Sequence, residues 1–227
     1  LVFVASPESM QPVVAGIEPS YLTIGLPENN QGRLGRGATS LVCEQCHGKS
    51  VVAIGPGLGD SREVDKLVTT LYRDLPQPVV VDADALNALA RTGANLAEHA
   101  GPRVLTPHPG EFARLVTAVP RVDVPTHEWE QMKVDVEPDA GRASPHGNAG
   151  VHSLASDDRE RAAAEFAARY GVVLLLKGAG TVVTDGDRVY VNPTGNSGLA
   201  TGGTGDVLTG LIAAILAQGL APFEAAQ

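Results

Sequence analysis

Residues 192–219 read NPTGNSGLATGGTGDVLTGLIAAILAQG, and the rest of the chain is interpreted around this stretch. Glycines crowd its first half, whereas its second half repeats apolar residues at the three- and four-residue spacing of a buried helix face. A glycine-rich loop therefore leads into a helix that is predicted to begin near Gly205 and Asp206. Free N–H groups and the helix dipole attract anions at such a junction, and glycines let a ligand approach the backbone. The stretch predicts an anion site with the carboxylate of Asp206 at its entrance.

Upstream of this loop, short apolar runs alternate with helical patterns. Buried strands are predicted at residues 1–5, 50–54, 78–81, 103–106 and 172–176. Helices are predicted at about residues 61–73, 85–91, 111–116 and 156–170. Residues 20–40 predict a loop with one short strand, and residues 182–191 predict a hairpin around Asp-Gly-Asp. This alternation is typical of an α/β protein whose mainly parallel sheet is covered on both faces.

Polar and glycine-rich segments follow several of these predicted strands. Residues 55–59, which contain three glycines and end with Gly59, follow the strand predicted at residues 50–54. They would form either part of a ligand-binding crevice or a tight turn between strand and helix. Asp82 and Asp84 follow the next strand; they could hold a metal ion, contact a ribose hydroxyl or cap the following helix. Both would face one side if the strand continued that far. His108 lies between two prolines that would leave its imidazole exposed, and Glu111 would open a helix as its cap.

The composition excludes some classes of protein. A formal charge of −9 and a pI near 5.1 argue against a nucleic-acid surface, which needs a basic stripe. We expect no membrane span and a cytoplasmic location, because the chain has no long apolar run or visible signal peptide. Loop N–H groups and a metal ion would still allow an acidic protein to bind phosphates.

Two further segments stand outside the alternating pattern. Cys43 and Cys46 form a CxxCH pattern, typical of c-type haem attachment or half of a zinc site. No second ligand pair has zinc spacing, so we interpret them as reduced thiols in a short helical or loop segment. Residues 118–153 predict a long loop or insertion, and their histidines do not match a metal spacing.

Several segments, in order, resemble the NAD(P)H-hydrate dehydratases, nicotinamide-nucleotide repair enzymes with a ribokinase-like fold. They are residues 54–59 (IGPGLG), 81–87 (VDADALN), 105–115 (LTPHPGEFARL), 176–185 (LKGAGTVVTD) and 192–210 (NPTGNSGLATGGTGDVLTG). The resemblance implies a three-layer α/β/α domain over residues 1–227. Compared with the family pattern, we expect this domain to lack its first strand and to end early, so that the chain is truncated at both ends.

The resemblance also implies a reaction. Such a hydro-lyase would remove water from the S epimer of hydrated NADH or NADPH, with ADP as co-substrate (ATP is possible) and Mg²⁺ bridging the phosphates. AMP and phosphate would be released. The family further implies a homotetramer and an epimerase partner, either fused or separate.

Site residues follow from the matching motifs. The hydrated dinucleotide would contact Gly59, His108, Pro109, Gly110, Glu111, Phe112, Ala113, Arg114 and Asp206. ADP would contact Lys177, Gly178, Ala179, Gly180, Thr181, Asn196, Ser197, Gly198, Leu199, Ala200, Thr201, Gly202, Gly203, Thr204 and Gly205. Asp206 is the candidate general base, with a helix N-cap as the structural alternative.

Two other functions fit the same residues. A small-molecule kinase of the same fold, acting on a vitamin precursor or a sugar, would share the glycine-rich loop and the base. A catalytically silent nucleotide-binding module would bind ADP without turnover.

Overall fold

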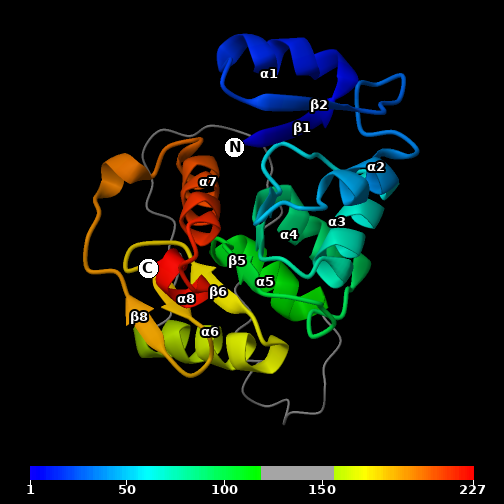
Figure 1. Ribbon diagram of the computed structural model, residues 1–227. Helices are drawn as coiled ribbons and strands as arrows, with labels where there is room; N and C mark the ends of the chain where they lie inside the picture. The colour runs from blue at the N-terminus through cyan, green and yellow to red at the C-terminus, as the bar shows by residue number, and fades with distance from the viewer. Residues whose placement is uncertain (119–155) are drawn as a thin grey trace, which may run out of the picture.

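A computed structural model describes residues 1–118 and 156–227, and the greater part of the predicted insertion lies outside these residues. Its main sheet has six strands in the order β3-β4-β5-β6-β7-β8. Strands β5, β6 and β8 of this sheet are labelled in Figure 1. Their bounds are Val52–Ile54 (β3), Val79–Val81 (β4), Arg103–Leu105 (β5), Val173–Leu176 (β6), Val182–Thr184 (β7) and Val189–Val191 (β8). The first four strands are parallel, and β7 and β8 form the predicted antiparallel hairpin.

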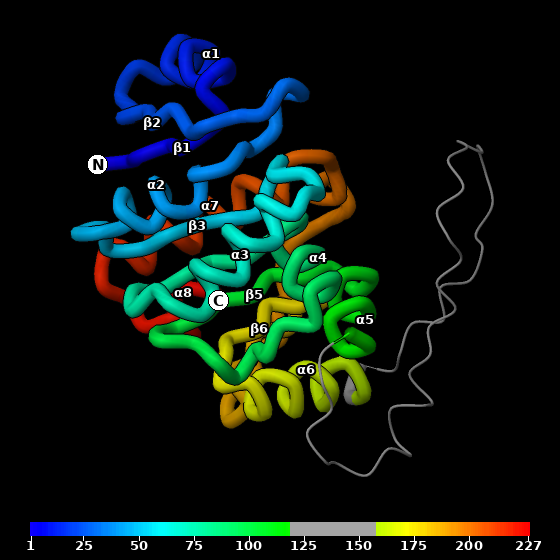
Figure 2. Tube along the Cα trace, turned by 90° about the vertical axis from the view of Figure 1, so that its right-hand side faces the viewer, coloured from blue at the N-terminus to red at the C-terminus, as the bar shows by residue number. Residues whose placement is uncertain are grey.

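Helices cover both faces of this sheet. One layer consists of α3 (Arg62–Asp74), α4 (Ala83–Thr92), α5 (Pro109–Ala118) and α6 (Ser156–Tyr170). The opposite layer consists of α7 (Thr204–Ala217) and α8 (Pro222–Ala226). Figures 1 and 2 show the two layers.

The alternation of side chains along the strands explains these layers. Val79 and Val81 belong to the core cluster under the first helical layer, whereas Val80, between them, belongs to the cluster under α7 and α8. Because successive residues of a strand face opposite ways, a strand buried on both sides is apolar throughout. The three-layer α/β/α arrangement predicted from the sequence is therefore confirmed.

Two predictions of burial were wrong in part. Val207 and Leu211, which belong to the apolar pattern of α7, are 72% and 54% exposed, whereas Ile212 and Leu216 are buried. A helix touches a sheet along one stripe only, so a wider apolar face remains partly uncovered. Ala53 of β3 is also exposed, because β3 lies at the edge of the six-stranded sheet.

The N-terminal segment forms a separate small unit. Strands β1 (Phe3–Pro7) and β2 (Leu22–Leu26) pair in parallel with each other only, joined through the 3₁₀ helix η1 (Glu8–Met10) and α1 (Gln11–Ile17). Figure 1 shows the unit at the top of the view, next to α2 (Ala38–Gln45). The strand predicted at residues 1–5 is present as β1, but the prediction of its burial was wrong, since Leu1 and Phe3 are exposed. An apolar run indicates a strand but does not identify what covers it.

The cysteines lie in and just after α2. Neither Cys43 nor Cys46 forms a disulfide, and burial raises the pKa of Cys46 to about 11. In the part of the chain that the structure describes, no group of three or more His, Cys, Asp or Glu side chains could hold a metal ion. No helix among the described residues is long and apolar enough to cross a membrane.

Candidate active site

The glycine-rich loop ends in a helix start that is open to solvent. Residues 196–203 are exposed, and α7 begins at Thr204 with Gly203 as its N-cap at a φ of 88°. A side chain is strained at such a φ, so glycine suits this position. Asp206 lies in the first turn of α7 and is exposed. Because Gly203 occupies the cap, the alternative interpretation of Asp206 as the N-cap is wrong.

The 3₁₀ helix η3 (Ser197–Leu199) shapes the loop before α7. The Asn196 side chain caps η3, its Oδ1 accepting from the Gly198 N–H at 2.8 Å. The hydroxyl groups of Thr201 and Thr204 lie 3.0 Å apart, across the turn that leads into the helix. These short-range bonds hold the loop in place while its backbone faces solvent.

Lys177 begins a second glycine-containing loop, directly after β6. Its N–H donates to the Pro107 carbonyl at 2.9 Å, which ties the ends of β5 and β6 together. Arg159 of α6 supports this loop by donating from Nη1 to the Ala179 carbonyl at 3.0 Å. A Cβ at Gly178 would lie 3.2 Å from Nη2 of Arg159, so the guanidinium occupies the space that a side chain would need. The sequence did not single out Arg159.

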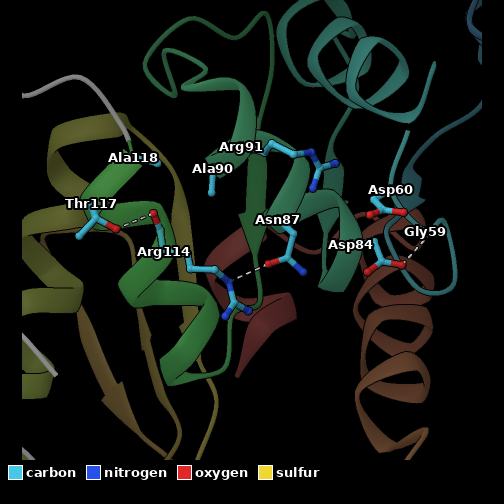
Figure 3. Close-up of a pocket in the computed structure, with 9 residues that line it drawn as sticks. All are labelled: Gly59, Asp60, Asp84, Asn87, Ala90, Arg91, Arg114, Thr117 and Ala118. Atoms are coloured by element: carbon cyan, nitrogen blue, oxygen red, sulfur yellow. Dashed lines mark hydrogen bonds between the residues drawn. The ribbon is translucent and has the colours of Figure 1, made fainter. Parts of the chain in front are cut away.

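Asp82 and Asp84 have different roles in the structure. Asp82 is buried, and its carboxylate accepts from Lys177 Nζ at 2.6 Å and from Thr209 Oγ1 at 2.7 Å. Asp84 instead accepts from the Gly59 N–H at 2.8 Å (Figure 3). Strand β4 ends at Val81 and α4 begins at Ala83, so the strand does not continue far enough to place both carboxylates on one side. Asp82 occupies the N-cap position of α4, but its side chain makes no cap hydrogen bond.

The segment around His108 forms a capped helix start. Helix α5 begins at Pro109, and Glu111 accepts the His108 N–H at 2.9 Å through Oε2. Such a bond from the third helical position back to the cap is half of a capping box, which confirms the capping role of Glu111. The imidazole of His108 is 52% exposed, whereas Glu111 and Phe112 are buried, and the Phe112 ring packs edge-on against Phe166. Of these residues, His108 is accessible to a ligand through its side chain.

A cleft of about 680 Å³ opens beside α4 and α5 (Figure 3). It is lined by Gly59, Asp60, Asp84, Asn87, Ala90, Arg91, Arg114, Thr117 and Ala118. Arg114 donates from Nε to Asn87 Oδ1 at 2.9 Å, whereas Arg91 pairs with Asp65 and Asp60 pairs with Arg33. Within the described residues, the Arg114 guanidinium has no other hydrogen-bond partner, so its terminal amino groups remain available to an anion.

Of the residues that line this cleft, the family resemblance predicted Gly59 and Arg114 as site residues, and the sequence left Asp84 as a possible metal ligand, ribose contact or helix cap. Asn87 follows Asp84 by one helical turn on α4, and this spacing was the signal that could have identified it. Neither Asp206 nor the glycine-rich loop lines the cleft. Both regions nevertheless lie at the carboxyl ends of the parallel strands, where open α/β sheets bind ligands.

Comparison with known proteins places these features in a family. The family model described as NAD(P)H-hydrate dehydratase matches residues 32–227. The bifunctional NAD(P)H-hydrate repair enzyme of Moorella thermoacetica is 40% identical over 228 residues, which cover 100% of this chain and 37% of that protein. The ADP-dependent (S)-NAD(P)H-hydrate dehydratase of Neisseria meningitidis is 38% identical over 178 residues, which cover 76% of this chain and 49% of that protein.

A solved structure agrees with these relatives. The ADP/ATP-dependent NAD(P)H-hydrate dehydratase of Bacillus subtilis, co-crystallized with ATP/Mg²⁺ and soaked with CoA, superposes with a TM-score of 0.65 at 27% identity. The match covers 99% of this chain and 66% of that one. A ribokinase-like superfamily protein of Enterococcus faecalis has the same fold, with a TM-score of 0.66 at 22% identity over 96% of this chain and 61% of that one. This chain, which spans well under half the length of the Moorella enzyme, therefore belongs to the NAD(P)H-hydrate dehydratase family.

Proposed function

We propose that this protein removes water from hydrated NADH and NADPH, of the S epimer, with ADP as the co-substrate. The observation that carries the proposal is the exposed carboxylate of Asp206. It lies in the first turn of α7, directly after an exposed glycine-rich loop. The names of the Neisseria and Bacillus relatives support the same reaction. ATP is a second possible co-substrate, because the Bacillus enzyme is named for both nucleotides.

The anion bound at the start of α7 is, in this proposal, the terminal phosphate of ADP. The start of α7 leaves the backbone N–H groups of Gly203 and Gly205 without partners in the helix, whereas the Thr204 N–H donates to the Thr201 carbonyl at 3.3 Å and would have to turn toward the phosphate. They would stabilise the charge that develops on the phosphoryl oxygens. The loop that begins at Lys177 would hold the remainder of the nucleotide.

Asp206 would act as the general base. The substrate hydroxyl oxygen forms a bond to the terminal phosphorus of ADP, the bond from that phosphorus to AMP breaks, and the hydroxyl proton passes to Asp206. The ring C–O bond of this phosphate ester then breaks, and phosphate leaves with the oxygen and the electron pair of that bond. A proton passes from the adjacent ring carbon to water, and the electrons of that C–H bond form the ring double bond. The products are NADH or NADPH, AMP and phosphate.

Mg²⁺ fits this site through the nucleotide rather than through a protein cage. In the described part of the chain, no cluster of three or more ligating side chains is present, so the phosphates and water would supply most of its ligands. The ion would neutralise phosphate charge. Co-crystallization of the Bacillus enzyme with ATP/Mg²⁺ supports this assignment.

The cleft beside α4 and α5 would hold the hydrated dinucleotide. Its volume of about 680 Å³ lies within the range of roughly 300–1,000 Å³ that is typical of small-molecule pockets. The dinucleotide carries phosphates, and Arg114 offers them a guanidinium that Asn87 holds in place. Gly59, fixed by Asp84, would let the ligand approach the backbone.

Partners follow from the same reaction. We propose a homo-oligomer, a tetramer by analogy with the family, in the cytoplasm. An epimerase, either fused or separate, would supply the S epimer, and the bifunctional Moorella relative supports such a link.

The experiment that tests this function uses hydrated NADH, ADP and Mg²⁺ with the full chain. We expect the absorbance band of reduced nicotinamide to recover, together with AMP formation. Phosphorylation of a vitamin alcohol or a sugar, without recovery of NADH under ADP or ATP, would favour the kinase alternative. Nucleotide binding without any turnover would favour the silent module.

A further inference from the structure

Asp82 is a buried carboxylate that joins three elements distant in sequence. It lies one residue after β4 and is 1% exposed. Its Oδ1 accepts from Lys177 Nζ, 95 residues away, and its Oδ2 accepts from Thr209 Oγ1, 127 residues away. A buried charge is costly unless it is paired and hydrogen-bonded, and here both oxygens have a partner. The ends of β4 and β6 and the first half of α7 thus meet at one carboxylate.

The backbone of Asp82 is fixed as firmly as its side chain. Its N–H donates to the Ile54 carbonyl at 3.0 Å, and its own carbonyl accepts from Ala85 at 3.0 Å. A Cβ at Gly55 would lie 1.8 Å from that carbonyl oxygen, so only glycine permits this approach of β3 to β4. The carboxylate is therefore presented from a rigid point at the strand ends.

Lys177 lies against the start of α7. Its Nζ would be 3.2 Å from a Cβ at Gly205, the residue just before Asp206. The ammonium has three donors, and among the described residues Asp82 is its only hydrogen-bond partner. Two donors and a positive charge are thus left beside the helix start that already attracts an anion.

The geometry points to Asp82 as a positioning residue, which holds the Lys177 ammonium under the start of α7 for the terminal phosphate of a nucleoside diphosphate. Without Asp82, the flexible lysine side chain would have no fixed place, and its charge would lie unopposed next to the positive end of a helix. Thr209 fixes the second carboxylate oxygen and so orients the first toward Lys177. The inference rests on the proposed function for the identity of the anion, ADP.

The test measures ADP binding by calorimetry with the full chain, so that turnover is not required. We expect Asp82→Asn and Lys177→Met each to weaken ADP binding at least tenfold. The double variant should bind no more weakly than Lys177→Met alone, because the two residues act as one unit. Asp185→Asn breaks a different ion pair, with Arg188, and should leave ADP binding unchanged.

A milder pair of variants covers the case in which Asp82→Asn fails to fold. Thr209→Val keeps the shape but removes the donor to Oδ2, and it should weaken ADP binding severalfold. Thr209→Ser retains the hydroxyl and should restore binding. In turnover, Thr209→Val should raise KM for ADP and leave KM for the hydrated dinucleotide unchanged, a split that general loosening of the fold would not produce.

The outcomes separate this inference from the proposed function. A folded Asp82→Asn or Thr209→Val variant that binds ADP as the unaltered chain does would overturn the inference, as would additive losses in the double variant. Absence of ADP binding by the unaltered chain would also overturn it. ADP binding that follows the expected pattern, without dehydration of hydrated NADH, would overturn the proposed function alone.

Discussion

The two ends of the main sheet each hold a charged side chain, and they satisfy its hydrogen bonds in different ways. Arg103 begins β5 and is 1% exposed; its guanidinium donates four hydrogen bonds, to the carbonyls of Tyr72, Leu75, Gln77 and Pro102. Burial lowers the pKa of Arg103 to about 10. At the carboxyl ends of the strands, Lys177 makes one side-chain hydrogen bond to the described residues, and two of its donors remain.

We interpret Arg103 as a charge that stabilises the fold and Lys177 as a charge that serves the proposed binding site. Backbone carbonyls surround Arg103 almost completely, so that it has little left to offer a ligand. Lys177 instead lies 22% exposed beside a bare glycine-rich loop, and a buried carboxylate holds it there. Loss of Arg103 should therefore affect folding, whereas changes near Lys177 should affect binding or turnover.

The largest effect on turnover is expected from Asp206→Asn, at the carboxyl end. General-base catalysis contributes about 10²–10⁴-fold to a rate, so kcat should fall by roughly that factor. ADP affinity should stay within about threefold, because the backbone donors that bind phosphate are retained. Steady-state kinetics and calorimetry on the same preparation check both. An unchanged kcat would show that Asp206 is not the base.

At the opposite end, Arg103→Met should reduce stability rather than catalysis. Four carbonyls would lose their donor, two of them (Tyr72 and Leu75) in buried hydrogen bonds, and we expect a loss of at least about 3 kcal/mol in the free energy of unfolding. Denaturant titration measures this loss. Arg73→Met, at an exposed ion pair with Asp74, should change it by less than about 0.5 kcal/mol. A marked fall in kcat for the folded Arg103→Met variant would contradict the division between the two ends.

The Arg114→Gln variant tests binding in the cleft beside α4 and α5 separately from binding at the glycine-rich loop before α7. Hydrogen bonds to charged groups contribute about 1.5–3 kcal/mol, so KM for the hydrated dinucleotide should rise roughly tenfold or more. KM for ADP should not change, because Arg114 lines the cleft and not the loop. Steady-state kinetics with each substrate varied in turn measure both constants, with Arg73→Gln as the control. Equal increases in both KM values would argue that the cleft and loop are one site.

The smallest expected changes in ADP binding and stability come from alanine substitutions at two glycines of α7, Gly205 and Gly210. A Cβ at Gly205 would come within 3.2 Å of Lys177 Nζ, whereas one at Gly210 would meet nothing within 4 Å. Gly205→Ala should therefore weaken ADP binding severalfold. Gly210→Ala should leave binding unchanged and stabilise the helix by about 0.5–1 kcal/mol. Calorimetry measures ADP affinity, and thermal unfolding measures stability. Equal ADP affinity in both variants would argue against the proposal that a side chain at Gly205 disturbs the Lys177 ammonium.

Much of the fold followed from the sequence, because local patterns determine it. The apolar runs of β4, β5 and β6 and the periodic spacing of α3 predicted their elements, and the glycines before Asp206 predicted the loop and helix start. The isolation of β1 could not be predicted, since an apolar run does not specify what pairs with it. Nor could the burial of Arg103, because charged residues are rarely fully buried.

The sequence singled out His108, Arg114 and Asp206 from local motifs, and their roles in a site stay predictions. It did not indicate the long-range contacts around them. The bonds from Asp82 to Lys177 and Thr209 span 95 and 127 residues, and no local spacing encodes them. The sequence left Asp82 as a metal ligand, a ribose contact or a helix cap, whereas its side chain is hydrogen-bonded to Lys177 and Thr209.

The central claim is that ADP drives the dehydration, and the stoichiometry of a single reaction tests it most directly. AMP, phosphate and NADH would be quantified together after incubation of the chain with (S)-hydrated NADH, ADP and Mg²⁺. The account predicts one AMP and one phosphate for each NADH restored, with no restoration when ADP and ATP are both omitted. NADH formation without nucleotide cleavage, or nucleotide cleavage with a phosphorylated product that persists, would contradict it.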